Sequence, residues 1–208
     1  MQPKVIFLDW DGTLSNSKFW ENCTAPSLPP QVISRITNFL FSESPDLIVD
    51  WMKGFIPSSR IVAIVAGRFK VDARELQKEL ERSCRDMQFI NPGIPDRIRK
   101  IRQRGTRVVI ATDNMDTFEN WTVPSLELDR IFDSILSSPT RGALKAEVQC
   151  DHSPFFDLYL SQQGVDRTES VLVDDNISNM AVESIGMQFA HVTADSPLEI
   201  MLDSFIAE

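Results

Sequence analysis

Apolar residues along this chain occur in two patterns, short continuous runs and longer stretches with helical spacing. Continuous runs bounded by turn residues predict strands that are buried on both faces, as in parallel sheets. Such runs occur at residues 5–8, 106–111, 131–136, 170–173 and 188–192. Helical spacing occurs between them at residues 94–104, 155–164 and 177–185. Helices that alternate with buried strands predict an α/β fold with a doubly wound parallel sheet.

One long segment interrupts this alternation. Residues 15–90 have the pattern of several amphipathic helices with short joints, and Asp72 has the position of an N-cap before the last of them. Within this segment, the short apolar run 60–66 fits either a helix or a strand. We therefore predict an α/β core of residues 1–14 and 93–208, with an inserted helical subdomain of residues 15–92.

Composition and charge narrow the class of protein. The 208 residues are 42% hydrophobic and 25% charged, as is ordinary for a soluble globular chain, and the net charge of −9 argues against nucleic acid as a partner. The longest apolar run, Ile61 to Ala66, is too short to span a membrane, and the N-terminus lacks a signal-peptide pattern. Three isolated cysteines predict a reducing compartment, so we expect a cytoplasmic protein. Two histidines are too few for a His-rich zinc site.

Two carboxylates follow the first predicted strand, in Asp9-Trp10-Asp11-Gly12-Thr13. On an extended chain, Asp9 and Asp11 point to the same side and Trp10 to the other, where we expect it to pack. Two acids that share one space repel each other, and a cation or a shared proton offsets that cost. By itself, a pair of this kind could equally cap a following helix or turn.

Two other predicted strands also end in polar residues. Thr112-Asp113-Asn114 follows the second strand, and Asp174-Asp175-Asn176 follows the fourth. The carboxyl ends of parallel strands meet at one edge, which is where open α/β sheets bind ligands. Carboxylate oxygens without Cys or His favour Mg²⁺, and helix N-termini beside them favour a phosphate group. A carboxylate there can serve as a nucleophile.

These residues resemble the motifs of the haloacid dehalogenase (HAD) superfamily. The first motif, D-x-D-G-T, is matched at residues 9–13, and the apolar strand that ends in Thr is matched at residues 108–112. The strand that ends in paired acids is matched at residues 171–175. The helical insert resembles the family's cap of the first type. The resemblance implies a HAD-like core with such a cap.

The resemblance also implies a Mg²⁺-dependent phosphatase that works through an aspartyl-phosphate on a small phosphorylated metabolite. Asp9 would be the nucleophile, and Asp11 the general acid and base. Mg²⁺ would be held by Asp9, the backbone carbonyl of Asp11, and Asp175.

The same resemblance assigns the phosphate-binding groups. Thr112 would hold the phosphoryl oxygens with help from Asn114. The family places a Lys after the third strand, and Lys145 is the default match, although Arg141 could supply the charge instead. Asp174 would either bind the ion through water or orient Lys145.

Asp11 discriminates within the family, because dehalogenases lack this acid and relatives that act on phosphate esters keep it. We therefore favour phosphoryl chemistry. Two alternatives stay open: a phosphomutase that acts on a sugar phosphate, or a HAD-like binding or regulatory module without turnover. In capped relatives, side chains of the cap set selectivity. The candidates to contact the leaving group are Lys18, Trp20, Arg60, Arg68 and Lys70. Side chains of these types more often pack in the interior or lie on the surface.

Overall fold

A five-stranded parallel sheet forms the centre of the computed structural model, which describes residues 2–207. Its strands are β1 (Val5–Leu8), β2 (Arg107–Thr112), β3 (Ser134–Ser137), β4 (Ser170–Asp174) and β5 (Gln188–His191). Their order is β3-β2-β1-β4-β5, and every neighbouring pair is parallel. In the central strand, Leu8 is level with Ile110 of β2 and Val173 of β4. The predicted parallel α/β sheet is confirmed.

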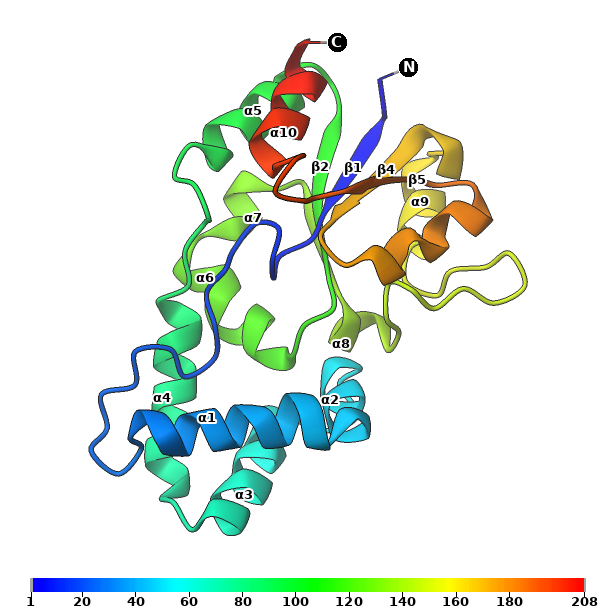
Figure 1. Cartoon of the computed structure of the whole chain (residues 1–208). Helices are drawn as coiled ribbons and strands as arrows, with labels where there is room; N and C mark the ends of the chain where they lie inside the picture. The colour runs from blue at the N-terminus through cyan, green and yellow to red at the C-terminus, as the bar shows by residue number, and fades with distance from the viewer. Residues whose placement is uncertain (1, 208) are drawn as a thin grey trace.

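Helices cover both faces of this sheet (Figure 1). On one face, α5 (Ile94–Gln103) and α10 (Leu198–Ala207) lie over Ile6 and Leu8. On the other, α9 (Asp157–Gln163) and the 3₁₀ helix η4 (Ile177–Ile185) lie over Val5 and Phe7. Short elements complete the core: η2 (Phe118–Thr122), α6 (Val123–Ser125), α7 (Leu128–Ile131), α8 (Ser138–Arg141) and η3 (Arg167–Glu169). Within residues 2–207, no helix has both the length and the apolar character needed to cross a membrane.

Three elements differ from the sequence-based expectation. The strand expected at 131–136 begins only at Ser134, because Ile131 ends α7 and the Asp133 carboxylate accepts a hydrogen bond from the Val108 N–H at 2.8 Å. The helix expected at 155–164 begins at Asp157, because the preceding phenylalanines are drawn into the core. The helix at 177–185 is 3₁₀ rather than α. In addition, α10 is a C-terminal helix that the sequence analysis does not predict.

A second group of helices lies beyond the carboxyl ends of the strands (Figure 1). It consists of α1 (Pro30–Asn38), the π-helix η1 (Phe39–Glu43), α2 (Pro45–Met52), α3 (Ser58–Phe69) and α4 (Ala73–Arg85). The ambiguous run 60–66 lies within α3. The Asp72 carboxylate caps α4 by accepting hydrogen bonds from two backbone N–H groups, at 2.8 Å and 2.9 Å. We call this group the cap; its limits, residues 15–92, stay a prediction. The outer limits of the predicted core, Met1 and Glu208, lie outside the described residues.

Asp116, which follows β2, ties the cap to the core. Its carboxylate accepts hydrogen bonds from the Ser58 N–H at 3.1 Å and from Trp51 Nε1 at 3.0 Å. The Ser58 hydroxyl donates to the same carboxylate. Nearby, a Cβ added to Gly54 would lie 3.1 Å from the Pro139 carbonyl oxygen, so this glycine lets the cap approach α8 closely. A charged acceptor thus holds the cap over the strand ends.

Asp116→Ala is expected to lower the free energy of unfolding by about 2 kcal/mol, because it removes the acceptor of these donors. Urea unfolding measures the change. Asp195→Ala, which alters an exposed carboxylate, serves as the control and should stay within about 0.5 kcal/mol of the wild type. Equal changes in both variants would contradict the role of Asp116.

Candidate active site

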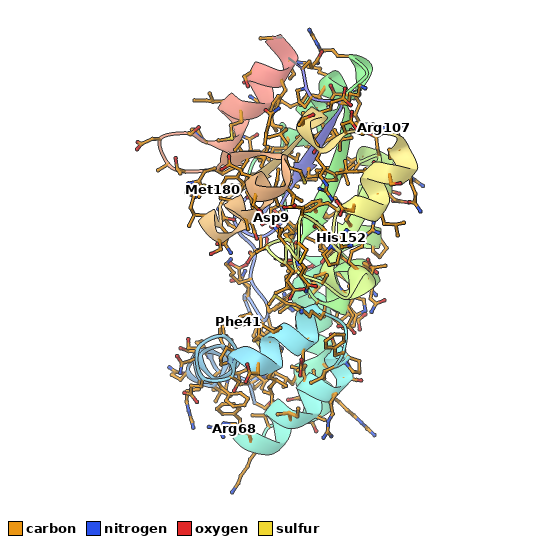
Figure 2. All side chains as sticks on the ribbon, turned by 90° about the vertical axis from the view of Figure 1, so that its right-hand side faces the viewer. Asp9, Phe41, Arg68, Arg107, His152 and Met180 are labelled. Carbon is orange, nitrogen blue, oxygen red and sulfur yellow. The ribbon has the colours of Figure 1, made fainter. Side chains whose placement is uncertain are left out.

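Asp9 lies in a buried network of charged side chains at the end of β1. It is 5% exposed, and its backbone N–H donates to the Val173 carbonyl at 3.0 Å, which fixes it beside β4. The Lys145 ammonium lies 2.5 Å from Asp9 Oδ1 and 2.6 Å from Asp174 Oδ2. Figure 2 shows Asp9 between the sheet and the cap. Three residues that are far apart in sequence therefore meet at the predicted edge.

Asp174 and Asp113 hold Lys145 in this position. Asp174 Oδ2 also accepts from Asn179 Nδ2 at 2.9 Å, and its Oδ1 accepts from the Asn176 N–H at 2.8 Å. Asp113 Oδ1 accepts from the backbone N–H of Lys145 at 3.0 Å. Donors thus occupy both oxygens of Asp174, which favours its orienting role. Sequence reasoning misses the part played by Asp113; its place at a strand end is the signal that could have found it.

Burial couples the charges of this network. Desolvation raises the pKa of Asp9 to about 8, and Lys145 opposes that shift. Desolvation alone would lower the pKa of Lys145, but Asp9, Asp174 and Asp113 raise it above its usual value. Desolvation also raises the pKa of Asp113 and of Asp175. Carboxylates outnumber the ammonium group here, so a further cation would be stabilised.

A divalent cation fits where three carboxylates converge. Asp9, Asp174 and Asp175 each place one oxygen within 4.8 Å of the others. A Cβ on Gly12 would collide with the Asp175 carboxylate, so glycine leaves room for that side chain. Oxygen ligands alone suit Mg²⁺. Donors occupy both oxygens of Asp174, whereas the hydrogen bonds of the described residues reach Asp9 at Oδ1 alone. Asp9 and Asp175 as ligands of the ion stay a prediction.

Thr112 and Asn114 end up at the same edge. Thr112 is fully buried, and its hydroxyl has no hydrogen-bond partner among the described residues. A buried hydroxyl without a partner is costly unless a ligand or water pairs with it, so this group fits a phosphoryl oxygen. Asn114 Oδ1 accepts from the Met115 N–H at 2.8 Å, and Asn114 borders a cavity between core and cap.

That cavity, of about 490 Å³, is also bordered by Asp11. The Asp11 side chain is 56% exposed and pairs with the Lys18 ammonium at 2.7 Å, whereas Asp9 is buried. The two acids of the first motif therefore have different environments. Asp11 is the one that meets solvent and the cap.

Of the five cap residues that sequence reasoning singles out, Lys18 borders this cavity. Trp20 is buried within the cap, where its indole N–H donates to the Leu76 carbonyl at 3.1 Å. The Arg68 guanidinium lies 4.4 Å from the centroid of the Phe39 ring. The other four candidates do not line this cavity: Trp20, Arg60, Arg68 and Lys70.

The structure also distinguishes Lys145 from Arg141. Arg141 ends α8, and desolvation lowers the pKa of its guanidinium. Among the ion pairs of residues 2–207, the partner of Asp9 is Lys145 and not Arg141. Trp10 is 1% exposed, with its ring 5.6 Å from that of Phe89, so the expectation that it packs is confirmed.

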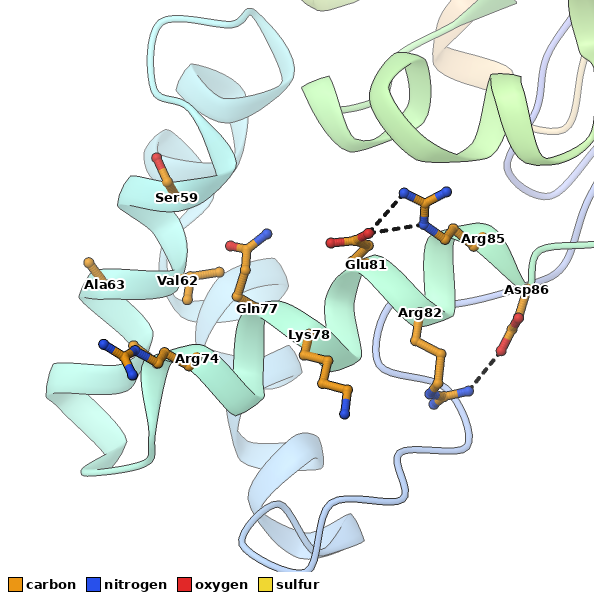
Figure 3. A pocket seen from close by; sticks show the side chains of 11 residues that line it. Ser59, Val62, Ala63, Arg74, Gln77, Lys78, Glu81, Arg82, Arg85 and Asp86 are labelled. Atoms are coloured by element: carbon orange, nitrogen blue, oxygen red, sulfur yellow. Dashed lines mark hydrogen bonds and ion pairs between the residues drawn. The ribbon is translucent and has the colours of Figure 1, made fainter.

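A second hollow lies between α3 and α4 of the cap (Figure 3). All of its lining residues belong to the cap. Four of its charged side chains form two ion pairs: Arg85 lies 2.9 Å from Glu81, and Arg82 lies 2.9 Å from Asp86. Arg74 and Lys78, which also line this hollow, have no ion-pair partner among the described residues, and the catalytic candidates Asp9 and Asp11 do not border it.

Comparison with known sequence families decides the family. The model of the haloacid dehalogenase-like hydrolases matches residues 3–182, a range that includes Asp9, Lys145 and Asp175. The chain belongs to this family. The resemblance seen in the sequence is confirmed. A search of curated protein sequences returned no match.

Solved structures of HAD proteins have a similar fold. The L-2-haloacid dehalogenase of Xanthobacter autotrophicus has a TM-score of 0.66 at 14% identity, with 97% of this chain and 87% of that chain covered. A HAD family enzyme of Bacteroides thetaiotaomicron, in complex with magnesium and inorganic phosphate, has a TM-score of 0.61 at 12% identity, with 92% and 95% covered. A HAD phosphatase of Thermococcus onnurineus has a TM-score of 0.58 at 20% identity, with 91% and 86% covered. Dehalogenases and phosphatases thus share the fold of this HAD-like hydrolase.

In this HAD-like hydrolase, Gly12→Ala is expected to weaken Mg²⁺ binding by about 10–100-fold, because the new methyl group displaces the Asp175 carboxylate. Gly105→Ala is the matched control: φ is +83° at Gly12 and +92° at Gly105, but a Cβ at Gly105 meets nothing within 4 Å. Both variants should lose about 1 kcal/mol of stability through the positive φ. Calorimetric titration with Mg²⁺ separates them, and equal affinities would contradict the role of Gly12.

Proposed function

We propose that this HAD-like hydrolase removes phosphate from a small phosphate monoester with Mg²⁺ as its cofactor. The observation that carries the proposal is the second acid, Asp11, which borders the cavity two residues beyond the buried Asp9. A departing halide needs no proton, whereas an ester oxygen needs one. The Thr112 hydroxyl and the Lys145 ammonium support a phosphoryl site beside Asp9.

The proposed reaction has two steps. An Asp9 carboxylate oxygen attacks phosphorus, the bond from phosphorus to the ester oxygen breaks, and Asp11 gives that oxygen a proton. The alcohol leaves, and Asp9 carries the phosphoryl group. Asp11, now ionised, then takes a proton from a water molecule while the water oxygen attacks phosphorus and the bond from phosphorus to the Asp9 oxygen breaks. Inorganic phosphate leaves, and Asp9 and protonated Asp11 are restored.

The neighbouring residues position these groups. Lys145 balances the charge of Asp9, while Asp174 and Asp113 hold Lys145. Asp9, Asp175 and the backbone carbonyl of Asp11 would hold Mg²⁺, which when bound neutralises negative charge on the carboxylate and the phosphate.

Release of inorganic phosphate from p-nitrophenyl phosphate, with Mg²⁺ and with EDTA, tests the proposal. Mg²⁺-dependent release that Asp9→Asn loses is the expected result. If wild type and Asp9→Asn release phosphate at the same background rate, the protein is instead a binding or regulatory module without turnover. Product analysis on a panel of phosphate esters separates free phosphate from the isomerised sugar phosphate that a phosphomutase makes.

Asp11→Asn should show a burst of p-nitrophenol followed by slow turnover. p-Nitrophenolate departs with little help from an acid, so the first step persists, whereas the second step needs the base and slows by about 10²–10⁴-fold. Mass spectrometry should find the phosphoryl group on the peptide that contains Asp9. Asp195→Asn, which changes an exposed acid, should behave as wild type. Slow turnover without a burst would place the role of Asp11 in the first step alone.

A further inference from the structure

The cavity beside Asp11 has an apolar wall where it leaves the catalytic residues. This wall consists largely of aromatic, branched and thioether side chains: Phe19, Phe41, Ile48, Met52, Met87 and Met115. Sugar hydroxyls placed against such a wall would lose their hydrogen bonds to water and gain none, which is costly. The wall therefore favours a substrate whose alcohol portion is apolar.

Each polar cap side chain that borders the cavity already makes one hydrogen bond or ion pair. The Ser17 hydroxyl accepts from the Gln88 N–H at 3.1 Å, and the Thr37 hydroxyl donates to the Ile33 carbonyl at 3.0 Å. Lys18, the cationic side chain of the lining, pairs with Asp11 at 2.7 Å. The cap side of the lining thus offers a sugar hydroxyl only the remaining hydrogen-bonding sites of Ser17, Thr37 and Lys18, beside a wall that is otherwise apolar.

Phe41 gives this wall a flat and accessible surface. Its side chain is 46% exposed although it is a large hydrophobic residue. It stacks on Phe19, with ring centroids 6.4 Å apart and an angle of 29° between the planes. Figure 2 shows Phe41 on the side of the cap nearer Asp9, whereas Arg68 lies farther away. An exposed phenylalanine that stacks on a half-buried one in the lining of a cavity is a surface that a ligand ring can cover.

We propose, on the basis of the phosphatase function above, that the substrate is the phosphate monoester of an alcohol that carries an aromatic ring. The phosphate lies at Asp9, Thr112 and Lys145, and the ring lies against Phe41 and its neighbours. A cavity of about 490 Å³ suits one ring on a short linker. Sugar phosphates are disfavoured, because their hydroxyls would face the apolar wall.

Two esters of primary alcohols test the proposal, because their leaving groups are chemically similar at the reacting oxygen. They are 2-phenylethyl phosphate and glycerol 1-phosphate. We expect kcat/KM to be about 10²-fold higher for 2-phenylethyl phosphate, as the burial of one ring predicts. Equal values, or a preference for glycerol 1-phosphate, would overturn the aromatic assignment while leaving the phosphatase function in place.

Phe41→Asn tests whether the apolar wall causes the preference for 2-phenylethyl phosphate. The ratio of kcat/KM for 2-phenylethyl phosphate to that for glycerol 1-phosphate should fall about tenfold in this variant. Phe55→Asn is the matched control, since Phe55 is a 67% exposed phenylalanine of the cap that does not line the cavity. Its ratio should equal that of the wild type. A ratio that is unchanged by Phe41→Asn would overturn the role of the wall.

A binding measurement separates this proposal from the proposed function. Asp9→Asn cannot form the phosphoryl-enzyme, so calorimetry with Mg²⁺ reports the affinity for each ester without turnover. At least tenfold tighter binding of 2-phenylethyl phosphate than of glycerol 1-phosphate supports the aromatic pocket. Absence of hydrolysis of both esters by the wild type would overturn the phosphatase function but not this binding result. Equal affinities would overturn the pocket assignment.

Discussion

Asp9→Asn is expected to lower phosphate release by about 10⁴-fold or more while the protein stays folded. The amide has the size of the carboxylate but cannot attack phosphorus. Without Mg²⁺, the free energy of unfolding should stay equal or rise, because desolvation raises the pKa of Asp9 and makes its ionised form costly. Lys145 keeps Asp174 as a partner at 2.6 Å. Phosphate release and urea unfolding are measured on the same preparations.

The combination of lost activity and retained stability is what identifies a nucleophile. Asp195→Asn, an exposed acid in the loop before α10, should match the wild type in both measurements. Turnover that survives in Asp9→Asn would refute the covalent mechanism. A large drop in stability would instead show that Asp9 serves mainly as a structural partner of Lys145.

The sheet could be predicted because β1 and β4 are buried at every position and are therefore apolar almost throughout. Such runs are visible without knowledge of the partner strands. The start of β3 could not be predicted, since it depends on the hydrogen bond from Val108 to Asp133, residues 25 positions apart. The 3₁₀ geometry of η4 was equally hidden, because the spacing of apolar side chains does not separate it from an α-helix.

The acids of the candidate site could be predicted because they directly follow strands, whose ends meet in any parallel sheet. Lys145 was harder to predict as the cation of the site, because the sequence leaves Arg141 as an alternative. Its place is set by Asp113, 32 positions away, and by the carboxylates that surround it. The lining of the cavity depends on how the cap sits on the core, so neither the Lys18–Asp11 pair nor the Phe41 wall follows from local patterns.

Lys145→Met is expected to lower the free energy of unfolding by about 3–5 kcal/mol near pH 8 in EDTA. The Lys145 ammonium is bonded to both Asp9 and Asp174 and is 2% exposed, so its removal leaves two buried carboxylates without a counter-charge. Methionine keeps most of the volume of the stem. Lys100→Met, which changes an exposed lysine of α5, is the control and should stay within about 0.5 kcal/mol of the wild type.

This loss should grow as the pH rises above about 8. Desolvation raises the pKa of Asp9 to about 8 even with Lys145 present, and removal of the ammonium raises it further. Above the ordinary carboxyl pKa of about 4, and up to the raised value, the folded chain holds a proton that the unfolded chain has lost. The free energy of unfolding therefore falls with rising pH in this window. In the wild type this decline ends near pH 8, so the variant should lie further below the wild type near pH 9.5 than near pH 7.

Addition of Mg²⁺ near pH 8 should restore part of the stability of Lys145→Met, because a divalent cation offsets the same carboxylates that the ammonium offsets. The recovery is measured as the shift of the urea midpoint with Mg²⁺ relative to EDTA, in the variant and in the wild type. A destabilisation that is equal near pH 7 and near pH 9.5, with no response to Mg²⁺, would mean that the packing of the Lys145 stem matters here rather than its charge.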